Sequence, residues 1–180
     1  MVLTREERLV RAEMSLAGLS VGDAFGDQFF KLDNRDVPPD TGVPPGPWAW
    51  SDDTEMACSV VDVLRRNGEI DQDALAASFA GRMDIGRRYG AGAFELLERV
   101  KSGDHWHRAA RELFDGKGSF GNGAAMRVAP LGAFFSDDLK RAAAQAELSA
   151  EVTHAHQEGI AGAVAVAVAA GHVASEPGPV

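Results

Sequence analysis

The segment SDDTEMACSVVDVLRRNG, residues 51–68, decides the fold class. Apolar side chains recur in it every three or four residues, which is the spacing of an α-helix with one buried face. Those side chains are Met56, Val60, Val63 and Leu64. Asn67-Gly68 is a typical helix end, because glycine readily takes the left-handed conformation that closes a helix. We therefore predict a helix from about Asp53 to Arg66.

The helical spacing recurs along the rest of the chain, whereas the strict alternation of a half-buried strand is nearly absent. Thr4 and Glu7 match a capping box that begins a helix running from about Arg5 toward Leu19. Its inner face is expected to carry Val10, Met14, Ala17 and Val21. Further helices are predicted at residues 72–82, 91–101, 105–114, 124–135, 138–148 and 157–173. Pro130 should kink or end the helix in which it falls.

Residues 33–48 are dense in proline and glycine, which predicts a loop between the first two helices. Neither internal repeats nor a domain boundary is visible in the sequence. We therefore predict a single all-α domain, residues 1–180, built as a packed bundle of helices.

Composition and charge exclude several classes of partner. The chain has 180 residues, 45% hydrophobic and 25% charged, with a formal net charge of −9. This charge repels nucleic acids and anionic membranes, and the densest basic spots, Arg65-Arg66 and Arg87-Arg88, are too short to overcome it. We expect neither kind of partner. An anionic ligand would have to be held by metal ions or by backbone N–H groups.

Three features predict a cytoplasmic location. Cys58 is the only cysteine, so no disulfide can form within the chain. Charged residues at positions 5–8 stand where a signal peptide would need an apolar core. The longest apolar stretch, residues 160–170, is shorter than the roughly 20 residues that span a bilayer.

Adjacent carboxylates open the helix at residues 53–66, and they admit two interpretations. Ser51 or Asp52 can cap the free N–H groups of the first turn, where acidic side chains also interact favourably with the helix dipole. Alternatively, Asp52 and Asp53 offer the hard oxygen ligands that magnesium or manganese binds, with further ligands supplied from elsewhere. The sequence pattern alone leaves both open.

The loop Ser119 to Gly123 has the sequence SFGNG and precedes a helical run. It is either a tight turn or a nest of backbone N–H groups that holds a phosphate. A dinucleotide-binding fingerprint would need a third glycine and a preceding strand, and neither is visible. His154 precedes a helix rich in glycine and alanine, whose small residues allow a ligand or another backbone to approach closely.

Four segments, taken together, resemble the ordered motifs of the ADP-ribosylglycohydrolase family. They are GLSVGDAFG (residues 18–26), WSDDT (50–54), SFGNGAAMRVAP (119–130) and THAH (153–156). The resemblance extends over most of the chain, and the third segment is the most specific. It implies an all-α orthogonal multi-helix bundle, incomplete at the C-terminal end. It also implies a hydrolase that removes ADP-ribose from modified protein side chains, or from related ADP-ribose conjugates, with two magnesium ions.

Carried over by position, the resemblance makes Asp52 and Asp53 catalytic and makes Ser51, Asp52 and Asp53 ligands of the magnesium pair. The substrate-binding residues would be Ser119, Phe120, Gly121, Asn122, Gly123 and His154. Two features depart from the family pattern: Phe30 stands where members commonly have a glutamate, and a later Asp-x-Asp-Thr motif does not follow. The alternatives are a catalytically silent ADP-ribose-binding or structural member of the family, or a truncated product.

Overall fold

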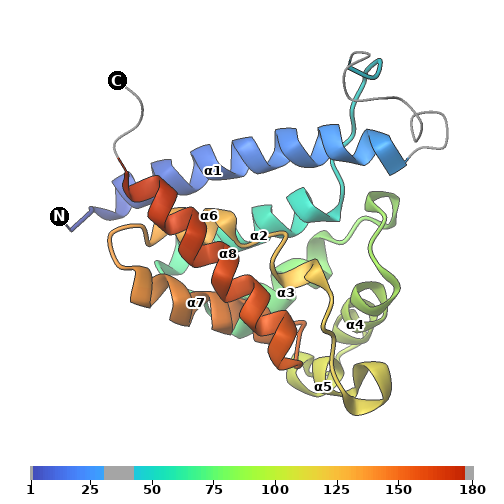
Figure 1. The fold of residues 1–180 in the computed structure, drawn as a ribbon. Coiled ribbons are helices and arrows are strands. Elements are labelled where there is room, and N and C mark those ends of the chain that lie inside the picture. Colours follow the sequence, from blue (N-terminus) through green and yellow to red (C-terminus); the bar gives the residue numbers. More distant parts are fainter. Residues whose placement is uncertain (1, 31–42, 177–180) are drawn as a thin grey trace.

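The computed structural model describes residues 2–30 and 43–176 (Figure 1). Within these residues the chain forms helices and no strand, which confirms the predicted all-α fold. The helices are α1 (Arg5–Gly26), α2 (Asp52–Asn67), α3 (Gln72–Arg82), α4 (Ala91–Lys101), α5 (Trp106–Gly116), α6 (Ala129–Phe134), α7 (Leu139–Glu151) and α8 (Gln157–Ser175). Short 3-10 helices are η1 (Asp27–Phe30), η3 (Ile85–Arg87) and η4 (Asn122–Ala124).

Helix α2 lies at the centre of the bundle and packs against α1, α3 and α6. The whole predicted stripe of α2 is buried, and Val60 and Leu64 are fully enclosed. Ser51 is the N-cap, and Gly68 closes the helix at φ 77°. The first turn of α2 is therefore fixed by the core on one side and by its cap on the other.

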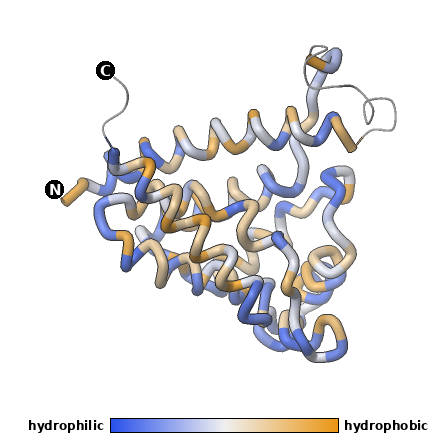
Figure 2. Tube along the Cα trace, in the orientation of Figure 1, coloured by the Kyte–Doolittle hydropathy of each residue, from blue (hydrophilic) through white to orange (hydrophobic). Residues whose placement is uncertain are grey.

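Helix α1 is longer than predicted and faces the other way. It runs to Gly26, and the predicted inner residues Val10, Met14 and Val21 are 52%, 71% and 65% exposed. Leu9, Ala12 and Leu16 turn to the core instead. The prediction was wrong because α1 carries two apolar stripes at helical spacing, as the recurrence of apolar residues along its length shows (Figure 2). Periodicity alone cannot choose between two such stripes.

Close packing of α6 on α8 requires glycine. A Cβ atom at Gly132 would lie 2.0 Å from the backbone oxygen of Ala167, so the two helices meet backbone to backbone. Of the predicted helix at residues 124–135, only α6 (Ala129–Phe134) is α-helical, and residues 125–128 after η4 are not in a helix. Pro130 neither kinks nor ends α6 but lies in its first turn, where a missing N–H removes no helical hydrogen bond.

By its length and its composition alone, helix α8 could cross a membrane. Core helices of globular proteins also meet these two criteria. Helix α8 packs against α6, α7 and η4. The expectations of no membrane partner and of a cytoplasmic location remain predictions. Of the predicted loop at residues 33–48, positions 33–42 lie outside the described residues, and 43–48 contain no helix.

Candidate active site

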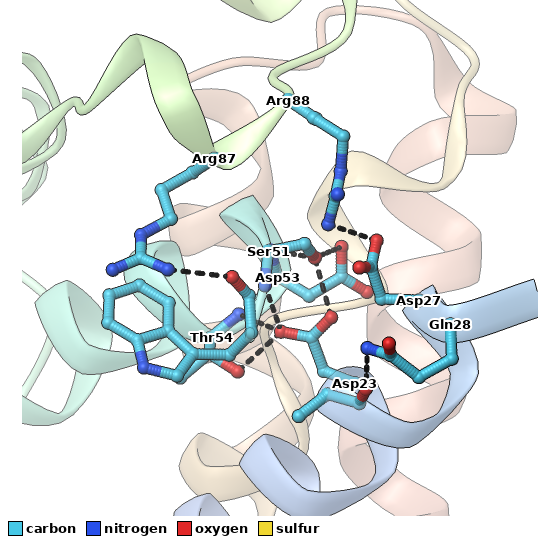
Figure 3. Close-up of polar contacts among 10 residues, drawn as sticks. Asp23, Asp27, Gln28, Ser51, Asp53, Thr54, Arg87 and Arg88 are labelled. Carbon is cyan, nitrogen blue, oxygen red and sulfur yellow. Dashed lines mark hydrogen bonds and ion pairs between the residues drawn. The ribbon is translucent and has the colours of Figure 1, made fainter. Parts of the chain in front are cut away.

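The start of α2 is held by a carboxylate from α1. Asp23 accepts hydrogen bonds from the Ser51 hydroxyl at 2.6 Å and the Thr54 hydroxyl at 2.6 Å (Figure 3). It also accepts from the backbone N–H groups of Ser51 at 2.8 Å and Thr54 at 3.2 Å. Ser51 in turn accepts from the N–H of Asp53 at 3.3 Å, so the capping interpretation is confirmed for Ser51. Asp23 thus fixes the turn that presents Asp52 and Asp53.

A further carboxylate, Asp27 of η1, lies beside this turn. Asp27 is buried, and its Oδ1 forms an ion pair with Arg88. Its Oδ2 is buried without a hydrogen-bond partner. In Figure 3, the Arg88 side chain extends toward Asp23, Asp27 and Asp53. We call these three residues, together with Asp52, the carboxylate cluster.

Burial and repulsion by neighbouring carboxylates raise the pKa values of Asp52 and Asp53. Burial, followed by the charge of Asp53, raises the pKa of the Asp52 carboxyl to about 7, and Arg88 opposes this rise. Burial and the charge of Asp23 also raise the pKa of Asp53 above its usual range, although its hydrogen bond with Ser51 works in the other direction. For Asp52, the charge of Asp53 thus raises the pKa more than the charge of Arg88 lowers it.

The donor set fits a magnesium site that is rich in water. Magnesium is usually bound through one or two carboxylates and keeps several waters or substrate oxygens. Asp52 and Asp53 supply such carboxylates, and each has a carboxylate neighbour whose charge a bound cation would offset. The Ser51 hydroxyl donates a hydrogen bond to Asp23 and accepts one from the backbone N–H of Asp53. This leaves the hydroxyl oxygen one lone pair for a metal. Across residues 2–30 and 43–176, no group of three or more His, Cys, Asp or Glu is placed to hold a metal ion.

A cavity of about 390 Å³ opens beside the carboxylate cluster. Asp52 and the glycine loop, residues 119–123, both contribute to its lining. The lining residues predicted from the sequence are Asp52, Ser119, Gly121, Asn122, Gly123 and His154. Ser51 and Asp53 stand behind Asp52 at the start of α2, outside the lining. The structure thus brings together two motifs that lie almost 70 residues apart in the sequence.

The N-terminus of α4 forms the wall that sequence reasoning missed. Residues 90–93, with sequence GAGA, line the cavity, and Gly90 caps α4 without a side-chain hydrogen bond. The first N–H groups of a helix lack intrahelical partners and attract anions. Glu55 anchors this segment to α2, because it accepts from the Tyr89 hydroxyl at 2.7 Å and from the N–H of Asp84 at 2.9 Å. The repeated small residues before a helical run were the signal available in the sequence.

Two exposed aromatic residues, Phe114 and Phe120, lie near the cavity. Phe114 lines it, at a left-handed position near the end of α5 (φ 54°), and its ring centroid lies 6.3 Å from that of Phe120. Both rings are more than half exposed. Phe120 does not line the cavity, its role in substrate binding stays a prediction, and Phe114 is an additional candidate binding residue.

The raised pKa of Asp52 predicts a pH-dependent stability. An unfolded aspartate ionises near pH 4, whereas folded Asp52 holds its proton to about pH 7, so folding loses stability as pH rises through that window. We expect metal-free Asp52→Asn to gain about 1 to 2 kcal/mol at pH 7.5, after allowance for the solvent exposure of this half-buried group. At pH 4 the gain should be close to zero. Urea unfolding at both pH values measures it, and an equal change at both would contradict the assignment.

Comparison with known proteins shows which family this chain resembles. The family model described as ADP-ribosylglycohydrolase matches residues 4–178. ADP-ribosylhydrolase ARH3 of Homo sapiens is 35% identical over 182 residues, covering 89% of this chain and 49% of that protein. The same enzyme of Xenopus tropicalis is 38% identical over 124 residues, covering 67% of this chain and 35% of that protein.

A bacterial protein, ADP-ribosylarginine hydrolase Tri1 of Pseudomonas putida, is 28% identical over 174 residues, covering 88% of this chain and 45% of that protein. The chain spans about half the length, or less, of these curated relatives. The match to the family model covers both the start of α2 and the glycine loop. This chain belongs to the ADP-ribosylglycohydrolase family.

Proposed function

We propose that the cavity binds ADP-ribose and that the chain supplies the substrate-binding side of a hydrolase that releases ADP-ribose from modified proteins or related conjugates. The observation that carries the proposal is the single cavity that joins Asp52, the α4 N-terminus and the glycine loop. The names of the relatives, ADP-ribosylhydrolase and ADP-ribosylarginine hydrolase, support it.

For each part of ADP-ribose, the cavity region offers side chains or N–H groups that could bind it. Adenine would stack on Phe114 and Phe120, since every base offers a face to aromatic rings. The diphosphate would accept from N–H groups of α4 and the glycine loop, which lets a chain of net charge −9 hold an anion. The distal ribose would then lie toward Asp52. In this order, ADP-ribose would extend from the exposed rings of Phe114 and Phe120 to the carboxylate cluster.

Hydrolysis requires that water form a bond to the anomeric carbon of the distal ribose while the bond to the acceptor atom breaks and the acceptor gains a proton. Magnesium, or manganese, would orient and activate this water and fix the ribose hydroxyls. Asp52 and Asp53, with Ser51, would hold the metal pair expected for the family. The carboxylates would also stabilise positive charge that develops at the anomeric carbon.

An ADP-ribose release assay tests the proposal. The 180-residue chain is incubated with ADP-ribosylated protein, with magnesium and with a chelator, and free ADP-ribose is measured. We expect release in magnesium that the chelator abolishes. No release in either condition, with no binding of ADP-ribose, would contradict the proposal.

A second candidate is a catalytically silent ADP-ribose-binding protein. It is favoured by the lack of a three-residue metal group in the described residues and by Phe30, an exposed side chain where family members commonly have a glutamate. In that case ADP-ribose would bind without turnover, and magnesium would not change its affinity. The release assay combined with calorimetry separates the two candidates.

A further inference from the structure

Arg127 is a charged residue enclosed in the core. Its side chain is fully buried, and its guanidinium donates to the backbone oxygens of Gly123 and Ser149, each at 2.9 Å. The guanidinium also lies 4.6 Å from the centre of the Phe79 ring. Burial lowers the pKa of Arg127 to about 9. A buried charge is costly unless it is hydrogen-bonded, and both terminal nitrogens of Arg127 are bonded, although its Nε has no partner. The bond to Gly123 ties the glycine loop to the core.

The same guanidinium donates to the Thr153 hydroxyl at 2.9 Å. That hydroxyl lies 2.7 Å from Nδ1 of His154. Arginine can only donate, so the Thr153 oxygen accepts from it, and the Thr153 proton is then available for donation to His154 Nδ1. In that arrangement His154 is neutral and carries its proton on Nε2. Burial, followed by the charge of Arg127, lowers the pKa of His154 to about 3, in agreement with the neutral form.

The His154 ring, which lines the cavity, also packs closely against the glycine loop. A Cβ atom at Gly123 would lie 3.1 Å from its Cε1, and one at Gly159 would lie 3.0 Å from its Cδ2. The ring is therefore clamped between the glycine loop and the first turn of α8. Gly159 also admits the backbone oxygen of Ser119, since a Cβ there would lie 2.8 Å away.

We propose that Arg127, Thr153 and His154 form one positioning unit that holds the glycine loop in its ligand-binding conformation. The Thr153 hydroxyl selects the His154 tautomer with its proton on Nε2, and Arg127 fixes both Thr153 and Gly123. These residues position the glycine loop, and Thr153 and His154 also line the cavity itself. The proposal rests on the proposed function for the identity of the ligand, ADP-ribose, and not for the arrangement of the unit.

Thr153→Val tests the unit, because valine keeps the shape of threonine and removes its hydroxyl. Thr153→Ser is the matched control that keeps the hydroxyl. Calorimetry with ADP-ribose should show affinity at least tenfold weaker for Thr153→Val and within about threefold of wild type for Thr153→Ser, since a buried group left unpaired costs more than a lost methyl. Nitrogen-15 NMR of His154 should show the Nε2–H tautomer in wild type and Thr153→Ser but not in Thr153→Val.

Hydrogen exchange at the amides of Gly121 and Gly123 gives a readout that needs no ligand. We expect faster exchange in Thr153→Val alone, while thermal unfolding shows all three proteins folded. If wild type and Thr153→Val have the same ADP-ribose affinity, the same His154 tautomer and the same exchange rates, the proposed unit is wrong. It is also wrong if Thr153→Ser loses as much affinity as Thr153→Val. If wild type binds no ADP-ribose, the proposed function fails, and the tautomer and exchange results still decide for or against the unit.

Discussion

Replacing both Asp52 and Asp53 by asparagine should lower magnesium-dependent release of ADP-ribose at least about 100-fold, the loss typical of removing a group that stabilises charge in the transition state. Asparagine keeps the size of each side chain but removes the charge that would hold a cation. Because Asp23 and Ser51 still fix the start of α2, the double variant should remain folded. The measurement is the initial rate of release at saturating substrate.

Glu69→Gln is the control for this experiment. Glu69 lies just beyond the end of α2, and its carboxylate is exposed and only 3.6 Å from Arg141. Exposed ion pairs of this kind contribute little to stability, so release should stay near the wild-type rate. Equal activity of the double variant and wild type would contradict a catalytic or metal-binding role for the carboxylate pair.

A negative charge placed in the glycine loop should abolish ligand binding. Gly121 has φ −68° and ψ 174°, an extended conformation open to any residue, and a Cβ there would meet only the Ser119 hydroxyl at 3.5 Å. Gly121→Asp would bring a carboxylate into the cavity wall. Two like charges about 5 Å apart repel by about 3 kcal/mol at an effective dielectric constant near 20, which is more than a 100-fold loss of affinity.

Gly121→Asn separates charge from size in that experiment. Asparagine has nearly the same volume as aspartate and adds no charge, so the affinity for ADP-ribose should fall less than about tenfold. Calorimetry of the two variants side by side measures the difference. Equal affinities would mean that no anionic part of the ligand lies against Gly121.

Patterns that are local in the sequence predicted the fold well. Helices α3 and α4 begin and end where predicted, because a cap and an apolar stripe act within a few residues of each other. The face of α1 was mispredicted, since Leu9, Ala12 and Leu16 compete with a second stripe of equal spacing. Only the packing of α1 on α2 and α6 decides between them.

The site was predictable where its parts follow one another in the chain. Ser51 as a cap and the glycine loop as a cavity wall both follow from short motifs. Asp27 and Arg88 could not be found in this way, because their ion pair joins positions 61 residues apart. The same holds for Arg127, whose burial against Thr153 has no signature in the sequence around either residue.

The most direct test of ADP-ribose binding is calorimetric titration of the 180-residue chain with ADP-ribose, with magnesium and with a chelator. We predict one ADP-ribose bound per chain, more tightly in magnesium, with affinity lost in Gly121→Asp. Absence of binding at millimolar ADP-ribose in both conditions would contradict the assignment of the cavity as its site.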